Sequence, residues 1–370
     1  MLFALPYLSC ACSLGRSNDE VLANLRRGVS PLAPLDSDIP GRTVLFGFVP
    51  GDLPCIDDPE YNFRSCQLLL HAVRNGNGAF ESLVSRYGAD RVAIVLGASN
   101  TGIHEAQGYV DQWLDSGVKP EAMRFSMIEL GTPAEYLASL LGVRGPAYVV
   151  STACSSGVKA FASARRLIEA GMVDAAIVGG VDGRCRFALN GFHALGALSD
   201  GLCRPLAPDR DGINLGEGVA LFTMEKISGS GHSGFAPLLA GVGESSDAYH
   251  PTSPDPDGRG AEAAMRAALA DAGISAAEVS YVNLHGTGTQ ANDDMEMKAV
   301  RRVFGEDFIA YESTKPLTGH CLGAAGAVEA AICWLKLANG DIRGNALSSS
   351  FAFGGSNAAL VMAGTDFNAD

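Results

Sequence analysis

The sequence lacks the cysteine and histidine spacings of common metal and redox sites. Its nine cysteines include no CxxC pair, and its seven histidines form neither an HExxH motif nor a Cys/His zinc pattern. We therefore expect reduced thiols in a cytoplasmic protein, with no disulfides and no bound metal.

Basic residues are also scarce. Lys and Arg number 27 against 41 Asp and Glu, which gives a formal net charge of −14. This balance excludes nucleic acid as the main partner, because phosphate binding needs a positive surface. An acidic protein partner would need a local basic patch to overcome the field of the whole molecule.

Long apolar runs are missing as well. No stretch reaches the roughly 18 uninterrupted apolar residues of a membrane span. The N-terminal MLFALPYLSCACSLG is broken by Pro6 and lacks the basic start and the cleavage site of a signal peptide. We expect a buried strand that ends near Gly15, followed by a helix over residues 18–27.

Glycine is abundant, with 45 residues gathered in short motifs. Brief β-branched runs alternate with segments of helical period, which predicts an α/β protein whose strands are buried on both faces. The expected helices include residues 158–170, 261–273 and 325–340. The expected strands cover residues 91–99, 145–153, 174–182, 218–226, 235–243, 279–286 and 357–364.

The segment GHSGFAP at residues 231–237 is expected to divide the chain into an N-terminal part, 1–230, and a C-terminal part, 231–370. The two parts show no convincing sequence repeat. The segment 247–260 (DAYHPTSPDPDGRG) is rich in Pro, Asp and Gly. It is expected to be a surface loop that leads into a helix.

The motif STACSSG places Cys154 between a predicted strand and a predicted helix. Unpaired N–H groups and the helix dipole at such a junction favour a thiolate. The dipole alone, about 0.3–1 kcal/mol, lowers a thiol pKa by well under one unit. From this motif, a nucleophile and a packed core cysteine are about equally favoured.

Three further motifs carry polar groups at strand ends. His285 lies in YVNLHGTGT, followed by Thr287 and Thr289, whose hydroxyls suit fixing one tautomer of the ring. Lys315 and His320 lie in STKPLTGHCLGAAG. Glu329, on the apolar helix that follows, needs a buried partner, for which Lys315 is the candidate. Each motif by itself also fits a purely structural role.

The segment SFAFGGSN (350–357) has two readings. It predicts a tight Gly-Gly turn before the last strand, or a backbone N–H directed at a developing oxyanion.

Taken together and in this order, TACSSG, HGTGT, STKPLTGHCLGAAG and FGGSN resemble the β-ketoacyl-acyl carrier protein synthases, and the resemblance covers nearly the whole chain. It implies the thiolase fold, with two similar halves in α-β-α-β-α layers. It also implies a homodimer, or a heterodimer with a homologous ketosynthase or chain-length factor, that works with acyl carrier protein and uses no separate cofactor.

The resemblance also implies roles. Cys154 would carry the acyl chain as a thioester. His285 and His320 would bind the malonyl thioester carbonyl, while Lys315 and Glu329 order the site. The remaining implied roles are the oxyanion hole from the N–H groups of Cys154 and Phe353, a gate from the Phe353 ring, a pantetheine path along Thr287 and Thr289, and an acyl pocket near Phe192.

The Cys-His-His set is similar to elongating enzymes, which extend an acyl chain by two carbons, rather than to the starter-condensing Cys-His-Asn set. Alternatives are a chain-length-factor-like partner subunit with little activity alone and, more remotely, a cysteine hydrolase. Thiolases are disfavoured because FAFGGSN has no second cysteine. ACSSG is similar to polyketide synthases, including the aryl-polyene branch. Acyl-chain length and starter do not follow from the sequence.

Departures from the family pattern concern the region between Gly51 and Arg91, which is short, and carrier docking. Gly196 occupies a position that is basic in housekeeping fatty-acid enzymes, and residues 62–76 offer only Arg64 and Arg74. Docking is therefore expected to be weaker, or to use other basic residues such as Arg26, Arg27, Lys119 and Arg124.

Overall fold

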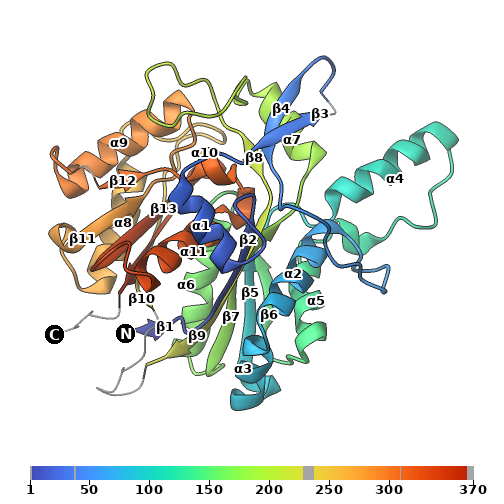
Figure 1. The fold of residues 1–370 in the computed structure, drawn as a ribbon, viewed down its shortest axis with the longest axis horizontal. Coiled ribbons are helices and arrows are strands. Elements are labelled where there is room, and N and C mark those ends of the chain that lie inside the picture. The colour runs from blue at the N-terminus through green and yellow to red at the C-terminus, as the bar shows by residue number, and fades with distance from the viewer. Residues whose placement is uncertain (1, 37–38, 228–236, 309, 365–370) are drawn as a thin grey trace.

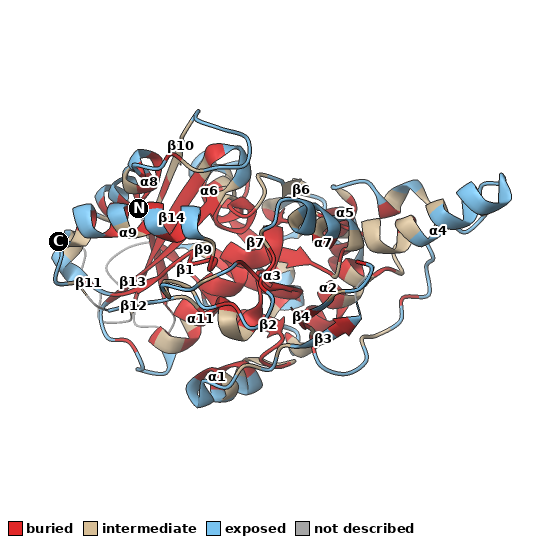
Figure 2. Ribbon diagram, turned by 90° about the horizontal axis from the view of Figure 1, so that it is seen from above, coloured by how far each residue is buried: buried red, intermediate tan, exposed pale blue. Residues whose placement is uncertain are grey.

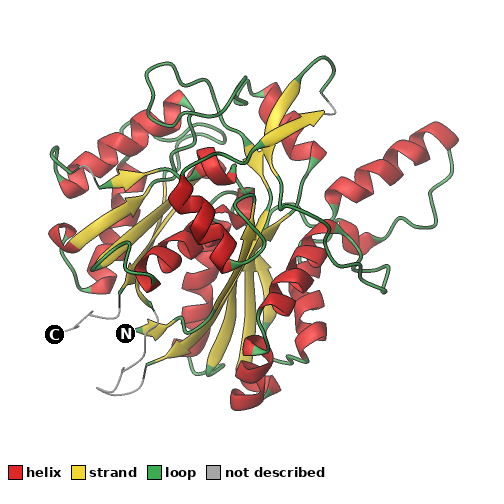
Figure 3. Cartoon of the chain, in the orientation of Figure 1, coloured by secondary structure: helices red, strands yellow, loops and turns green. Residues whose placement is uncertain are grey.

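The computed structural model describes residues 2–36, 39–227, 237–308 and 310–364. A mixed sheet runs through the centre of the molecule (Figures 1 and 3), in the order β12-β11-β13-β14-β10-β1-β9-β7-β5-β6, with β2 also paired to β9. The strands are β1 (Phe3–Ala4), β2 (Leu8–Cys12), β5 (Val92–Gly97), β6 (Ala147–Val150), β7 (Ala175–Asp182), β9 (Gly218–Lys226), β10 (Leu238–Ser246), β11 (Val279–Asn283), β12 (Tyr311–Glu312), β13 (Asn345–Ala352) and β14 (Ser356–Ala363).

The sheet contains the same topology twice. Numbered along the chain, the five strands β2, β5, β6, β7 and β9 lie in the order 3-2-4-5-1, and so do β10 to β14. In each set the third, second and fourth strands are parallel, the fifth is antiparallel to the fourth, and the first is antiparallel to the fifth. The two halves are therefore similar in structure, although the sequence shows no repeat. The expected division at 231–237 falls mostly on residues outside the described part of the chain.

Helices form three layers around the strands. Two of them, α6 (Ser156–Glu169) and α11 (Ala325–Ala338), follow the third strand of their own half and pack together in the middle layer. A Cβ at Gly157 would lie 2.5 Å from the backbone nitrogen of Ala327, so glycine is required for this contact. The outer layers are α8 (Arg259–Ala272) with α9 (Gln290–Phe304), and α2 (Arg64–Asn75), α3 (Ala79–Tyr87) with α5 (Thr132–Leu141).

The side chains of strand β5 show that both faces of the sheet are covered. Ala93 and Val95 face the middle core, whereas Val92, Ile94 and Leu96 face the outer core, and all five are fully buried. This is the period-2 arrangement of a strand enclosed between helices. The continuous apolar runs in the sequence predicted it correctly.

The remaining elements sit around the two-half core. A small sheet contains β3 (Ala33–Asp36), β4 (Thr43–Gly47) and β8 (Leu215–Gly216), and three more helices are α4 (Ile103–Ser116), α7 (Arg186–Ala194) and α10 (Lys315–Thr318). Short 3₁₀ segments cover residues 89–91, 125–127, 276–278, 322–324 and 353–355. The first helix, α1 (Asn18–Arg27), has the bounds predicted from the sequence, and Ser17 caps it by accepting from the Glu20 N–H.

Helix α4 projects from the body of the molecule (Figures 1 and 2). Ala106 is its one buried residue. We call residues 103–130 the apolar arm, because α4 and the segment after it expose Trp113, Leu114, Val118, Phe125, Ile128 and Leu130. Among the described residues, no helix combines the length and the apolar character needed to cross a membrane.

Candidate active site

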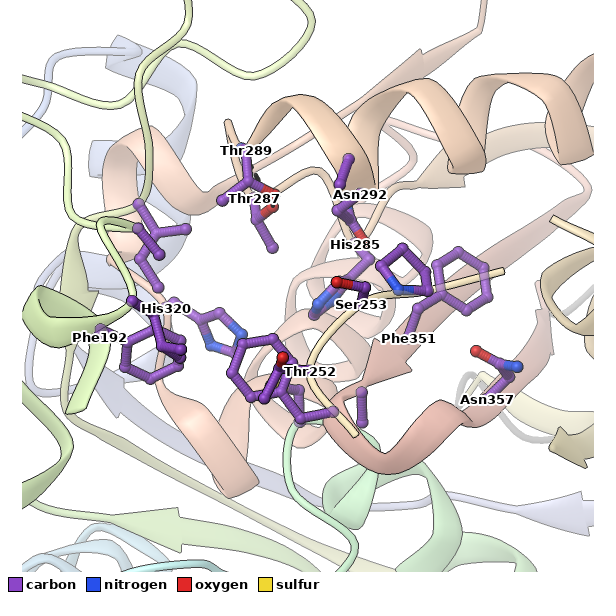
Figure 4. A pocket seen from close by; sticks show the side chains of 18 residues that line it. Phe192, Thr252, Ser253, His285, Thr287, Thr289, Asn292, His320, Phe351 and Asn357 are labelled. Carbon is purple, nitrogen blue, oxygen red and sulfur yellow. Dashed lines mark hydrogen bonds between the residues drawn. The ribbon is translucent and has the colours of Figure 1, made fainter. Parts of the chain in front are cut away.

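The motifs singled out in the sequence meet at one cavity of about 220 Å³. Figure 4 shows the rings of His285 and His320 near each other in this cavity. The predicted site residues that line the cavity are Cys154, Phe192, His285, Thr287, Thr289, His320 and Phe353. Lys315 and Glu329 lie behind this surface, both almost completely buried.

Cys154 sits on a tight turn between β6 and α6. The residue before it, Ala153, has a φ of 52°, in the left-handed region that non-glycine residues rarely adopt. The turn is held by the Thr152 N–H, which donates to Oγ of Ser156 at 2.8 Å. The Ser155 hydroxyl lies 2.9 Å from that of Ser356, which ties this turn to the turn of the other half. The cysteine is thus presented by a braced local structure.

Burial raises the pKa of the Cys154 thiol to about 12, and the nearby Lys315 charge opposes that rise. The thiol is therefore protonated in the resting protein at neutral pH. Any reaction at the sulfur must remove the proton during the chemical step.

His285 follows β11 and is held from both sides. Its N–H and that of Gly286 donate to the carboxylate of Glu296, on α9, each at 2.7 Å. Lys315 donates to the His285 carbonyl and lies 3.4 Å from ring Nδ1 through Nζ. Burial, followed by the Lys315 charge, holds the pKa of His285 well below its usual value, so the ring is neutral.

His320 follows α10, and its ring lies next to that of His285. Its N–H donates to the Asn214 carbonyl at 2.8 Å, and ring Nδ1 accepts the Leu322 N–H at 3.0 Å. Burial holds the pKa of His320 well below the usual range, and Lys315 adds to this effect. Ring Nε2 is buried and has no partner among the described residues.

These contacts determine the tautomers. A neutral imidazole has one N–H, and both Nδ1 atoms face donors, the Leu322 N–H for His320 and the Lys315 ammonium for His285. The proton of each ring is therefore on Nε2. The two ring centroids are 5.2 Å apart with planes at 86°. The site thus offers two N–H donors beside a cysteine.

The same contacts argue against a metal at this point. The ligand atoms of Cys154, His285 and His320 lie within 4.8 Å of one another, which resembles a three-ligand site. A histidine that binds metal through one nitrogen normally donates the other N–H to an acceptor. Here each Nδ1 faces a donor, so the donor set does not fit a metal ion.

Lys315 and Glu329 form a buried ion pair, as the carboxylate on an apolar helix indicated. Burial raises the pKa of Glu329, and Lys315 opposes the rise. Because Lys315 also contacts His285, the pair connects α11 to the histidine loop.

Two aromatic rings stand at the cavity. The centroids of Phe192 and Phe353 are 5.6 Å apart, and Phe353 is 39% exposed. Thr287 and Thr289, whose hydroxyls are 2.9 Å apart, lie on another side of the cavity (Figure 4). Gly354 and Gly355 have φ of 80° and 73°, which explains the glycine pair in the turn that carries Phe353.

Sequence reasoning missed several residues of the site. Glu296 was not singled out at all, and Asp182 was expected only as the last residue of the strand at 174–182. The loop 247–260 was expected only as surface, yet Thr252 and Ser253 line the cavity. For the two carboxylates, the available signal was an acidic residue that its segment would bury, as for Glu329.

Comparison with known proteins agrees with this geometry. Residues 67–229 match the family described as beta-ketoacyl synthase, N-terminal domain, and residues 237–346 match beta-ketoacyl synthase, C-terminal domain. The chain belongs to the β-ketoacyl synthase family. It is a condensing enzyme of the acyltransferase type, with the thiolase fold.

Two relatives cover most of the chain. Nodulation protein E of Rhizobium meliloti (strain 1021) is 33% identical, over 95% of this chain and 96% of the relative. A 3-oxoacyl-[acyl-carrier-protein] synthase 2 of Staphylococcus aureus is 33% identical over 80% of this chain and 83% of its own length.

Among solved structures, this β-ketoacyl synthase is similar to a chain in the complex of the ketosynthase ApeO with its chain length factor ApeC from Xenorhabdus doucetiae. The TM-score is 0.91 and the identity 38%, over 98% of both chains. The ishigamide ketosynthase/chain length factor gives a TM-score of 0.88 and 29% identity, over 98% of this chain and 99% of that one. Type II polyketide ketosynthases are thus among its structural relatives.

Proposed function

We propose that this protein joins a malonyl unit to an acyl chain held on Cys154, with loss of carbon dioxide. The observation that carries the proposal is the pair of Nε2–H donors of His285 and His320 beside the sulfur of Cys154. Two donors in a dry site suit the oxygen of an enolate, which is the charge that decarboxylation of a malonyl thioester creates.

The first step is thioester exchange. The Cys154 sulfur attacks the acyl carbonyl carbon of an acyl carrier protein, the bond to the pantetheine sulfur breaks, and the thiol proton ends on that sulfur. The backbone N–H groups of Cys154 and Phe353 would stabilise the tetrahedral oxyanion. The charge of Lys315 and the start of α6 favour the sulfur anion that forms in passing.

The second step releases carbon dioxide. The malonyl thioester carbonyl accepts from His285 and His320. The electron pair of the carbon–carboxylate bond passes into the enolate, whose carbon attacks the acyl group on Cys154. The carbon–sulfur bond then breaks, and the Cys154 thiolate takes up a proton from solvent. The product is a β-ketoacyl chain on the carrier, two carbons longer.

The carrier arm would enter past the Phe192–Phe353 pair and along Thr287 and Thr289. The substrates are carried on phosphopantetheine, and no separate cofactor enters the steps. The related ApeO–ApeC and ishigamide structures support a substrate from the aryl-polyene or another type II polyketide pathway.

Acyl carrier protein is the partner that this chemistry requires. Three arginines expected near docking surfaces are already paired, because Arg64 binds the buried Glu217, Arg26 binds Asp341, and Arg124 binds Glu60. Docking by these three side chains is therefore disfavoured.

The apolar arm supports a dimer. Leu114 and Phe125 are 79% and 71% exposed, and large apolar side chains gathered on one projecting segment are typical of a protein interface. The ketosynthase in the ApeO complex is paired with a chain length factor. A homologous subunit, or a second copy of this chain, is the expected occupant.

The deciding experiment is intact-protein mass spectrometry after mixing with acyl-loaded carrier, beside Cys154→Ala, followed by malonyl carrier. An acyl adduct absent from the variant, then release of a chain two carbons longer, supports the condensing enzyme. An adduct that hydrolyses to free acid without chain extension contradicts it.

The second candidate function is a partner subunit with little activity alone, which the exposed arm favours. Sedimentation of the wild type beside Leu114→Asp tests the arm, with Val29→Asp as control, since Val29 is 65% exposed away from it. A monomer without acylation, rescued by a homologous subunit, supports this reading. A homodimer that acylates Cys154 by itself contradicts it.

A further inference from the structure

Asp182 ends β7 as a completely buried carboxylate close to the site. The groups that donate hydrogen bonds to it come from two loops. Oδ1 accepts the N–H groups of Ser99 and Asn100 at 3.0 and 2.9 Å, and Oδ2 accepts the Ser99 hydroxyl at 2.8 Å and the Gly323 N–H at 2.6 Å. Donors that converge on a carboxylate stabilise its charged form.

One of these two loops, which contains Leu322 and Gly323, also carries His320. Leu322 has a φ of 51°, a left-handed conformation that is costly for a leucine. Its N–H is the group that fixes the His320 tautomer, and the next N–H, of Gly323, is bound by Asp182. A Cβ at Gly323 would lie 2.6 Å from the Ala98 carbonyl carbon, so the turn is also pressed against the second loop.

The second loop leads into the apolar arm. Ser99 and Asn100 follow β5, and α4 begins at Ile103. Asp182 therefore binds, through one carboxylate, the turn that orients His320 and the loop that leads into the arm expected to contact a partner subunit.

We propose that Asp182 is a positioning residue. It fixes the turn that orients His320 relative to the loop that leads into the apolar arm. This inference rests on the proposed function, because it assigns to His320 the enolate-forming step. Removing the carboxylate would leave Cys154 in place but loosen the turn that directs the His320 Nε2–H into the cavity.

The informative variant is Asp182→Asn, which keeps the size of the side chain. An amide can present only one oxygen. If its NH₂ replaces Oδ2, it opposes the Gly323 N–H; if it replaces Oδ1, it opposes the N–H groups of Ser99 and Asn100. One of the two loops is repelled in either orientation. Ser99→Ala is the milder second variant, since it removes one donor and keeps the carboxylate.

The experiment measures two rates on each purified full chain. These are acylation of Cys154 by acyl carrier and decarboxylation of malonyl carrier. We expect Asp182→Asn to slow decarboxylation about tenfold or more while acylation changes less than about threefold, and Ser99→Ala to act in the same direction but less. General unfolding would reduce both rates together. Asp174→Asn, at a partly exposed position directly before the same strand, is the matched control.

A double-mutant cycle with His320→Ala completes the test. If Asp182 acts through His320, its replacement adds little to the loss caused by His320→Ala. Additive losses, or equal effects on both rates, overturn the inference. A wild-type protein that does not decarboxylate malonyl carrier would instead contradict the proposed function, so the two failures are distinguishable.

Discussion

The backbone N–H of Leu322 donates to Nδ1 of His320 at 3.0 Å, and this contact places the ring proton on Nε2, toward the cavity. A single donor to a developing oxyanion is typically worth about 10²–10³ in rate. We therefore expect His320→Ala to lower malonyl decarboxylation about 100-fold or more.

Acylation of Cys154 should survive in the same variant, because that step does not use the imidazole. Stopped-flow detection of carbon dioxide, together with intact mass of the acyl-enzyme, checks both halves of the prediction. A variant that loses acylation as completely as decarboxylation would show that His320 serves the sulfur instead.

The Lys315–Glu329 pair gives a prediction about stability. Lys315→Met leaves the Glu329 carboxylate buried without its partner, which typically costs about 3–5 kcal/mol. The double variant Lys315→Met/Glu329→Gln removes both charges and should recover most of that loss. Urea unfolding measures the free energies.

The double variant should regain stability without regaining activity. The double variant lacks the ammonium that faces Nδ1 of His285, so decarboxylation should stay low although the fold is restored. Recovery of activity along with stability would mean that the pair is only structural.

Glu296 gives a prediction about pH. Burial raises its pKa to about 7, above the usual value of a carboxyl group. As the pH falls through about 7, the folded protein takes up this proton, and one oxygen becomes a donor. That oxygen then accepts its N–H, from His285 or from Gly286, much more weakly than a carboxylate oxygen does. Decarboxylation should therefore fall on the acid side with an apparent pKa near 7.

Protonation of Glu296 has the opposite effect on the stability of the fold. Because the folded pKa is above the unfolded one, Glu296 favours the folded state most below the unfolded pKa of about 4.3, and this contribution is lost as the pH rises from there through about 7. We therefore expect that, at about pH 6, the protein loses decarboxylation activity through Glu296 without losing stability. In Glu296→Gln, the acid limb of the rate profile should flatten and the rate should be low throughout. An unchanged acid limb would assign it to another group.

The sequence predicts those parts of this structure that depend on residues close together in the chain. Apolar runs predicted β5, β6, β7, β9, β10, β11 and β14 but not β12 or β13, helical period predicted α8 and α11, and TACSSG predicted the strand–helix turn of Cys154. The Lys315–Glu329 pair followed from the cost of burying a lone carboxylate. Each of these inferences needs only neighbouring residues or a single strong rule.

Other features depend on contacts that no local pattern records. Asp182 acts on residues 83 and 141 positions away in the chain, so in the sequence it is only the last residue of a strand. Likewise, the histidine tautomers depend on donors from separate loops. The repeated sheet order is conserved in backbone pairing between halves whose side chains differ, and therefore leaves no repeat in the sequence.

The Phe192–Phe353 pair gives a prediction about access to the sulfur. An aromatic pair is worth about 0.5–1.5 kcal/mol, so moving the Phe353 ring away is disfavoured by roughly 2- to 10-fold. Phe353→Ala should accelerate alkylation of Cys154 by iodoacetamide by about that factor. It keeps the backbone N–H, so acylation by carrier should persist, with less discrimination between short and long chains.

Timed alkylation followed by peptide mapping measures the effect and separates Cys154 from the exposed Cys55. Phe187→Ala is the matched control, since Phe187 is 67% exposed on α7 and does not line the cavity. Equal alkylation rates in the wild type and Phe353→Ala would mean that the ring does not limit access. The selectivity for acyl chains must then come from surfaces deeper than the aromatic pair, including those that a partner subunit supplies at the arm.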